Sequence, residues 1–278
     1  DVRLPRETAQ GAPRIAVVTG AYDRIEVILA KLGLATYDAN TEIIDFSTAS
    51  FTMFDGEGTG QFGDVMALFE TNSSTGLPRI RDFDIVFVNC GADLASLDTA
   101  ENRATIRAYV ENGGVLYATD WGYDVVEQSI PEYLRFVGEP DSDPTQPYAP
   151  GAAAVGPEGI SIDATVRDPL LAPWLDGVSC IGGACRNGDG TIRVEGFLAG
   201  WAVMEGAHSA HADDVFEHVG GTVPLDSNTQ ERPLSVEFPF GAGQVIYSSY
   251  HTVHEGAAGE GFYPQERVLQ YLVFEAGG

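Results

Sequence analysis

The chain has 278 residues, of which 44% are hydrophobic, and its formal net charge at pH 7 is −26. This length and hydrophobic content suffice for one large domain with a buried core. No apolar run approaches the roughly 18 residues that a membrane-spanning helix needs, and the negative charge disfavours binding to nucleic acid or anionic membranes. We therefore expect no membrane span and no nucleic-acid partner.

Strand and helix signals alternate along the first half of the chain, after residues 1–13, which we expect to form a flexible leader. "RIAVVTG" is a short apolar run that ends in glycine, which is typical of a buried parallel strand. The segment that follows has apolar residues at helical spacing and ends near Gly33. The predicted elements are strands at 14–20, 41–46, 82–91 and 115–119 and helices at 21–34 and 96–114, with an amphipathic segment from residue 121.

Two segments lack this alternation. Residues 47–80 are rich in Gly, Ser and Thr, and residues 137–232 begin with a long Pro- and Gly-rich stretch. The second segment contains strand candidates at 160–166, 191–197 and 200–206 and a helical turn at 168–175. Regular order returns in a hairpin through Gly241-Ala242-Gly243 and in a helix from Pro264. We therefore predict a single domain at 14–278 with two irregular, β-containing insertions at 47–80 and 137–232.

The order of these elements predicts the fold class. Alternating strands and helices form right-handed βαβ units, and such units assemble a mostly parallel sheet. The sequence therefore predicts a three-layer α/β fold with a mostly parallel, flavodoxin-like sheet flanked by helices.

The cysteines favour an oxidising compartment. Cys180 and Cys185 bracket "CIGGAC", a Gly-rich loop that can close a small disulfide ring. A zinc site is the weaker reading of this pair, because no second Cys or His pair lies close by. Cys90 ends an apolar strand and reads as a small buried residue. The expected location is extracellular or periplasmic.

Four segments together resemble the class I glutamine-amidotransferase-like fold, in the branch of ThuA-like proteins and β-galactosidase trimer domains. They are "RIAVVTG", "FDIVFVNCGADL", "IRAYVENGGVLYATDWGYDV" and "PLSVEFPFGAGQVIYSSYHTVHE". The resemblance implies a cysteine nucleophile at a strand-to-helix elbow and a histidine after a late strand. Asp120 and His251 occupy these positions here, so the resemblance implies a domain without glutaminase activity. It also implies that Cys90 and Gly91 form the turn after the strand that leads to the oxyanion hole in this family. This turn would lie in the same pocket as Trp121.

The candidate site centres on Asp120, which stands in "ATDWG" at the end of an apolar strand. "HTVHE" also follows a strand, so its side chains should reach the same C-terminal edge of the sheet. A second H-x-x-H pair lies at "HSAH" (208–211). Carboxylate and imidazole groups are suitable metal ligands. We predict a candidate site of Asp120, His251, His254 and Glu255, with Zn or Ca as the divalent metal.

Three interpretations of Asp120 remain open. It can act as a nucleophile, with His251 activating the water that releases the ester; the Asp-Trp-Gly turn is similar to that of haloalkane dehalogenases. It can help to bind a metal that activates water. It can also only cap the following helix. We favour a secreted or periplasmic, non-catalytic domain that binds a protein, a glycan, a small molecule or a second copy of itself. The alternative is a hydrolase that uses Asp120 and His251.

Overall fold

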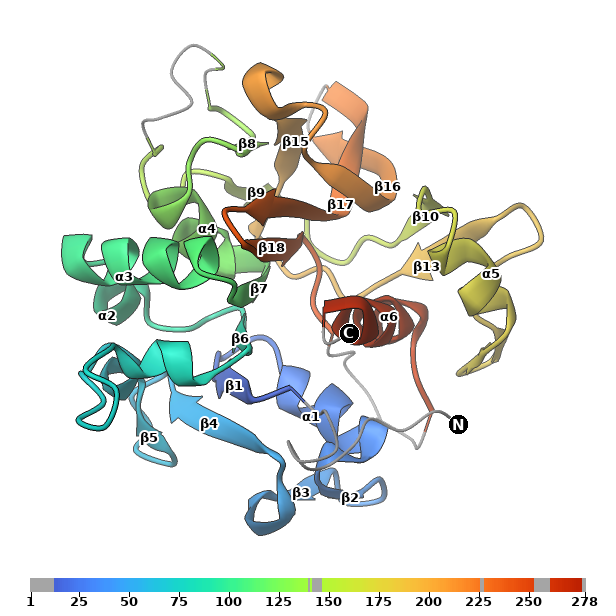
Figure 1. Ribbon diagram of the computed structural model, residues 1–278. Helices are drawn as coiled ribbons and strands as arrows, with labels where there is room; N and C mark the ends of the chain where they lie inside the picture. Colours follow the sequence, from blue (N-terminus) through green and yellow to red (C-terminus); the bar gives the residue numbers. More distant parts are fainter. Residues whose placement is uncertain (1–12, 140, 142–146, 226–227, 253–260, 277–278) are drawn as a thin grey trace.

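The computed structural model describes residues 13–139, 141, 147–225, 228–252 and 261–276. A ten-stranded sheet runs through the molecule in the order β13-β10-β16-β17-β18-β7-β6-β1-β4-β5 (Figure 1). The strands from β18 to β5 pair in parallel. Their bounds are β1 (Ile15–Val18), β4 (Phe51–Asp55), β5 (Gly63–Asp64), β6 (Ile85–Val88), β7 (Val115–Thr119) and β18 (Gly243–Ser248). The predicted α/β fold with a mostly parallel sheet is confirmed.

Helices cover both faces of this sheet, which gives three layers (Figure 1). Alternate residues of a strand point to opposite faces. Ile15 and Val17 of β1 therefore pack with one hydrophobic cluster, and Ala16 and Val18 pack with the other. The first cluster includes residues of α1 (Ile25–Leu29), α5 (Leu171–Asp176) and α6 (Pro264–Ala276), and the second includes residues of α2 (Leu94–Leu97), α3 (Ala100–Glu111) and α4 (Tyr123–Ser129).

A side-chain cap and a glycine set the two ends of α3. Thr99 begins α3, because its hydroxyl accepts a hydrogen bond from the backbone N–H of Asn102 at 3.2 Å. The chain leaves α3 at Gly113, whose φ of +106° suits glycine. Helix α1 continues as a π-helical segment, η2 (Ala30–Leu34). Short 3-10 turns lie at η3 (Phe46–Thr48), η4 (Val65–Leu68), η5 (Arg79–Asp82), η6 (Asp120–Gly122) and η7 (Ser209–His211).

The strand predicted at 41–46 does not join the main sheet. It forms β3 (Ile43–Asp45), which pairs with β2 (Thr36–Asp38) in a separate hairpin. The strand beside β1 is β4, which lies inside the predicted 47–80 insertion. Burial explains the difference, because Phe51 and Phe54 of β4 are buried whereas Ile43 is 63% exposed. The irregular segment therefore begins only after Asp55.

The predicted 137–232 insertion extends the same sheet. Its strands β10, β13 and β16 continue the sheet beyond β17 in antiparallel pairing, and their apolar residues enter the cluster that packs on α6. The strand candidates at 160–166, 191–197 and 200–206 are confirmed, whereas β16 was not predicted. These strands are β10 (Ile162–Val166), β13 (Thr191–Val194), β14 (Trp201–Ala202), β15 (Met204–Ala207), β16 (Phe216–Leu225) and β17 (Asn228–Phe240); β14 pairs with β9 (Ala154–Gly156) and β15 with β8 (Leu134–Phe136).

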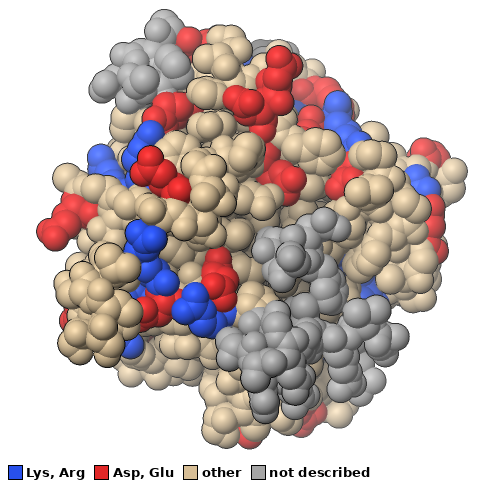
Figure 2. All heavy atoms as spheres, in the orientation of Figure 1, with Lys and Arg blue, Asp and Glu red and all other residues tan. Residues whose placement is uncertain are grey.

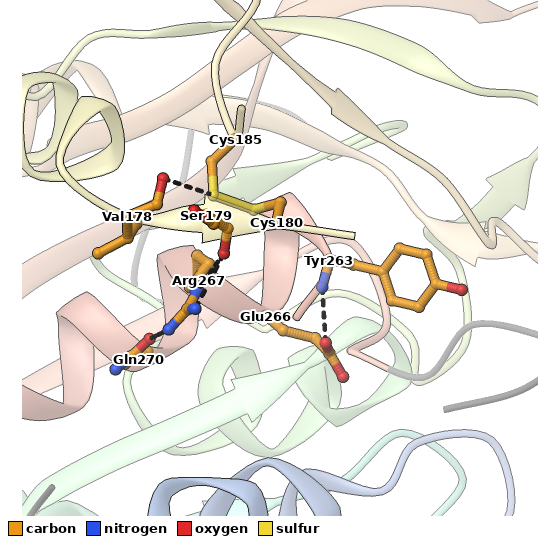
Figure 3. Close-up of a disulfide and its surroundings, with 8 residues drawn as sticks. All are labelled: Val178, Ser179, Cys180, Cys185, Tyr263, Glu266, Arg267 and Gln270. Atoms are coloured by element: carbon orange, nitrogen blue, oxygen red, sulfur yellow. Dashed lines mark hydrogen bonds between the residues drawn. A yellow bond between two sulfur atoms is a disulfide. The ribbon is translucent and has the colours of Figure 1, made fainter. Parts of the chain in front are cut away.

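A disulfide joins Cys180 and Cys185, across the small hairpin of β11 (Ser179–Cys180) and β12 (Gly183–Ala184). This hairpin lies against the start of α6 (Figure 3). The Arg267 guanidinium donates to the Ser179 carbonyl at 2.9 and 3.2 Å, and the Ile181 N–H donates to the Phe262 carbonyl at 2.9 Å. The disulfide loop is thus attached directly to the last helix.

The charged residues are spread over the surface. On the face shown in Figure 2, acidic side chains are scattered and several lie beside basic ones. The ion pairs of the described residues include Arg14 with Asp84 and Arg107 with Glu132. Within the described ranges, no helix is long and apolar enough to cross a membrane.

Candidate functional site

Three side chains meet where three neighbouring strands end. Cys90 follows β6, Asp120 follows β7 and His251 follows β18, and these strands are adjacent in the order β18-β7-β6. One ligand atom from each residue, the thiol Sγ, a carboxylate oxygen and an imidazole nitrogen, lies within 4.8 Å of the other two. Parallel strands bring their C-terminal ends to one edge of a sheet, which is why residues so far apart in sequence converge.

Asp120 occupies a strained elbow between β7 and α4. Its φ is +41°, a left-handed conformation that non-glycine residues rarely adopt. Gly122 allows the turn to fit closely, since a Cβ at this position would lie 3.1 Å from the Val88 carbonyl oxygen. The Tyr247 hydroxyl donates to the Asp120 carbonyl at 3.1 Å. The surrounding strands therefore hold this elbow in place.

Both carboxylate oxygens of Asp120 have partners. Oδ1 accepts a hydrogen bond from the Ala202 N–H at 2.6 Å. Oδ2 lies 2.7 Å from His251 Nε2 and 3.4 Å from the Cys90 thiol, which donates to it. Cys90, Asp120 and His251 are only 1%, 2% and 2% exposed. The three side chains thus form a closed cluster, and β14 of the second insertion covers one side of the carboxylate.

Asp120 and His251 are in direct contact, and the pair is ionic when the imidazole is protonated. Nε2 of His251 lies 2.7 Å from Oδ2 of Asp120, close enough for a charge-assisted contact. Burial lowers the pKa of His251, whereas the adjacent Asp120 carboxylate, the charge of Asp23 and the backbone of Gly196 raise it. The pKa of His251 is above its usual value, because the hydrogen bonds and negative charges around the imidazole together outweigh desolvation.

The Cys90 thiol is held in its protonated form. Burial raises its pKa far above the usual range, and the charge of Asp120 raises it further. The backbone N–H of Cys90 donates to the Thr119 hydroxyl at 3.0 Å. A reactive cysteine needs a thiolate, and this environment disfavours one unless a cation is present.

The sequence did not reveal Asp23, which lies beside this cluster. Its Oδ1 accepts hydrogen bonds from the backbone N–H of Thr252 at 3.0 Å and from the Thr252 hydroxyl at 2.5 Å. Its Oδ2 is buried without a hydrogen-bond partner. Asp23 therefore fixes the backbone next to His251. The available signal was its place in "TGAYD", just after the first strand and on the same sheet edge.

Of the other predicted site residues, Trp121 and Gly91 adjoin the cluster, and two lie outside the described residues. His254 and Glu255 lie outside the described residues, so their role as ligands stays a prediction. Trp121 stacks edge to face on Tyr22 with ring centroids 5.3 Å apart, and its indole N–H donates to the Gly200 carbonyl at 2.7 Å. Gly91 has a φ of +87°, which suits the tight turn after Cys90.

The "HSAH" pair does not converge on a shared site. His208 Nδ1 lies 3.1 Å from Asp141, and His211 Nδ1 lies 2.8 Å from Asp214. In the part of the chain that the structure describes, the only group of three or more His, Cys, Asp or Glu ligands that could hold a metal ion is that of Cys90, Asp120 and His251. We call this group the Cys-Asp-His cluster.

Comparisons with known proteins give a fold-level result. No protein-family model matches the sequence, and no curated protein matches it. A cytoplasmic protein of Salmonella typhimurium has a similar structure, with 12% identity, a TM-score of 0.50 and coverage of 94% of this chain and 98% of that one. This similarity shows a shared fold and carries no statement about activity.

Two further solved structures are similar to this chain at lower TM-scores. One is a ThuA-like protein of Bacteroides uniformis, with 10% identity, a TM-score of 0.44 and coverage of 100% of this chain and 91% of that chain. The other is a β-galactosidase of Bacillus circulans sp. alkalophilus, with 10% identity, a TM-score of 0.41 and coverage of 95% of this chain and 31% of that chain.

Proposed function

We propose that this chain is a metal-binding α/β domain without glutaminase activity, and that Cys90, Asp120 and His251 bind one Zn²⁺ ion. The observation that carries the proposal is the convergence of three ligand atoms within 4.8 Å in a buried cluster. A buried thiol, carboxylate and imidazole at the ends of three strands match the ligand types of zinc sites.

The ligand types favour Zn²⁺ over Ca²⁺. Thiolate and imidazole ligands suit zinc and similar transition metals, whereas calcium takes oxygen ligands. The raised pKa of Cys90 does not oppose the proposal, because a bound metal ion stabilises the thiolate strongly. Asp120 Oδ2 lies 2.7 Å from His251 Nε2 and 3.4 Å from Cys90 Sγ, so the carboxylate can bind the same ion.

The same geometry argues against a nucleophilic role for either Cys90 or Asp120. A glutaminase needs a thiolate at the elbow, and the elbow residue is Asp120. Cys90 lies on the neighbouring strand, and its thiol donates to a carboxylate. Asp120 itself is a poor nucleophile, because Oδ1 accepts from Ala202 and Oδ2 contacts two side chains. Its carboxylate is better suited to binding an ion.

A metal-assisted hydrolase is the second candidate. The strained elbow at Asp120 favours it, because such conformations concentrate at active sites. A bound zinc ion would supply Lewis acidity and lower the pKa of water. Asp120 and His251 would hold the ion, and Asp23 would keep the His251 backbone in place. The burial of all three ligands favours the non-catalytic form of the proposal.

Metal titration tests the proposal. Protein stripped with a chelator should bind one Zn²⁺ per chain in calorimetry, and Co²⁺ should give a thiolate charge-transfer absorption. Cys90→Ser should abolish that absorption, and Asp120→Asn and His251→Gln should weaken binding of either ion. His208→Gln is the matched control, since His208 is also buried beside one carboxylate but outside the cluster. Unchanged zinc binding in all three cluster variants would refute the proposal, as would the absence of binding by the wild type.

Location and partners are further parts of the proposal. The disulfide of Cys180 and Cys185 supports an extracellular or periplasmic location, because such bonds persist in oxidising compartments. Thiol labelling of protein from the native compartment would test this, with two blocked cysteines expected. A protein, glycan or small-molecule partner, or a second copy of the chain, stays a prediction that binding assays must decide.

A further inference from the structure

The connection between β12 and β13 carries an exposed Asn187-Gly188 pair. In such a pair the backbone nitrogen of the glycine can attack the side-chain amide of the asparagine, and glycine hinders this attack least because it has no Cβ. The chain contains a second pair of this kind, Asn112-Gly113, which is also exposed. Exposure therefore does not distinguish the two pairs, whereas their hydrogen bonds do.

The attacking nitrogen is free at Gly188. The Gly190 N–H donates to the Asn187 carbonyl at 2.9 Å, which makes Asn187 the first and Gly188 the second residue of a β-turn. The hydrogen bond of such a turn joins its first and fourth residues, so the N–H of the second takes no part in it. Among the described residues, none accepts a hydrogen bond from the Gly188 N–H. This nitrogen can therefore approach the side chain without first leaving a partner in the described part of the chain.

The Asn187 side chain is held by one exposed contact. Its Nδ2 donates to the Thr191 hydroxyl at 3.0 Å, and that hydroxyl donates to Asp189 Oδ1 at 2.7 Å. Water can replace this contact because Asn187 is exposed. Gly188 also has open space, since a Cβ added there would meet no atom within 4 Å. These neighbours therefore leave room for the rearrangement that the attack requires.

The Asn112-Gly113 pair is fixed at the end of α3. The Gly113 N–H donates to the Val110 carbonyl at 2.9 Å, so the attacking nitrogen already has a partner. Asn112 Nδ2 donates to the Ala108 carbonyl at 2.7 Å, and the Asn112 N–H donates to the same carbonyl at 3.2 Å. An attack here would have to open these bonds and unwind the last turn of the helix. The local structure therefore sets the two pairs apart.

We propose that Asn187 is a site of spontaneous deamidation in the folded protein. The Gly188 nitrogen forms a bond to Asn187 Cγ, and the bond from Cγ to the amide nitrogen breaks. The proton of the Gly188 N–H passes through water to that nitrogen, which leaves as ammonia. The resulting cyclic imide takes up water and opens to aspartate or isoaspartate, so the reaction needs no oxidant or reductant.

The product changes the link between the disulfide hairpin and β13. Either form adds a negative charge close to Asp189 in the sequence. Isoaspartate also adds a main-chain carbon, at a place where the Asn187 N–H donates to the Thr191 carbonyl at 2.7 Å. Thr191 begins β13, the edge strand of the main sheet. The longer backbone should therefore loosen the start of this strand.

Peptide mapping of aged protein tests this inference. Folded protein is held at mildly alkaline pH and sampled over time, and each sample is digested at acidic pH so that the digestion itself causes little deamidation. The Asn187 peptide should gain the mass of deamidation and become a substrate of an isoaspartate methyltransferase. The Asn112 peptide should change about tenfold more slowly, because its hydrogen bonds must open first. In urea, where both pairs are unfolded, the two rates should be similar.

Gly188→Ala is the matched block. The added Cβ has open space and φ lies outside the left-handed region, so the variant should fold as the wild type does and deamidate much more slowly. Asn187→Asp should reproduce the charge of the aged protein in isoelectric focusing. Equal rates at Asn112 and Asn187 in the folded protein would overturn the inference, as would deamidation of Asn187 in urea but not in the folded state.

Discussion

His251 Nε2 lies 2.7 Å from Asp120 Oδ2, at the adjacent ends of β18 and β7. This contact joins a residue from the middle of the chain to one near its end. It also places an imidazole and a carboxylate next to the Cys90 thiol, inside a closed part of the fold. The function that we propose depends on this one relationship, because two of the three zinc ligands make it.

Zinc should stabilise the folded protein. A ligand that binds only the folded state at about 100 times its dissociation constant adds about 2.7 kcal/mol to the free energy of unfolding. We expect a gain of this order for the wild type in urea unfolding with Zn²⁺. Asp120→Asn should gain little, because it removes the ligand that contacts both other side chains. Equal gains in the two proteins would contradict the assigned ligands.

The left-handed backbone at position 120 predicts that a glycine variant is more stable there than an alanine variant. Because φ is +41°, Asp120→Gly should be about 1 kcal/mol more stable than Asp120→Ala, although both lose the carboxylate. Chemical denaturation of the two variants measures the difference. Ala104, exposed inside α3, gives the opposite control: Ala104→Gly should lose about 1 kcal/mol. Equal stability of the two Asp120 variants would show that the elbow is not strained.

Lys31, the only lysine of the chain, forms a buried ion pair with Glu266 at 2.8 Å. Their side chains are only 2% and 4% exposed. Lys31→Met should lower the free energy of unfolding by about 3–5 kcal/mol, since it leaves Glu266 charged and buried.

The double variant Lys31→Met/Glu266→Gln should recover most of that loss, because no unpaired charge remains and the Gln carbonyl can still accept from the Tyr263 N–H. A double-mutant cycle by urea unfolding checks this. Simple addition of the two single losses would mean that the ions are not coupled.

The pair of Arg14 and Asp84 predicts a pH dependence. Asp84 accepts from Arg14 Nη2 at 2.7 Å and Nε at 3.1 Å, and this contact lowers the pKa of the carboxyl. Its contribution is therefore present above the unfolded pKa of about 3.9 and is lost as pH falls through the lower folded pKa. The pair is exposed, so we expect about 0–1 kcal/mol. Unfolding curves of wild type and Asp84→Asn should converge at acid pH; a constant gap would refute the linkage.

The disulfide should add modest stability. A ring of this size contributes about 2 kcal/mol by the loop-entropy estimate. Cys180→Ser/Cys185→Ser should therefore unfold at lower denaturant than the wild type. A reductant should shift the wild type to the same midpoint and leave the double variant unchanged. A reductant effect on the double variant would implicate Cys90 instead, because it is the remaining cysteine.

Local patterns in the sequence were enough to predict most of the parallel strands and the helices around them. Continuous apolar runs such as 85–88 and 115–119 become strands buried on both sides, and the helical spacing at 100–111 becomes α3. The prediction that residues 41–46 form the second strand of the main sheet was wrong. Residues 41–46 and 51–55 have similar local patterns, and it is residues 51–55 that pair with β1. Only burial of Phe51 and Phe54 against the sheet distinguishes them.

By itself, the sequence determined which residues follow strands, and therefore that Asp120 and His251 would lie at one edge of a parallel sheet. It also placed Cys180 and Cys185 close enough to pair. The tertiary structure alone decided that Cys90 joins Asp120 and His251, that Asp23 supports them and that Glu127 faces Glu139. The physical reason is the strand order β18-β7-β6 and the packing of the second insertion on α4, which no local pattern encodes.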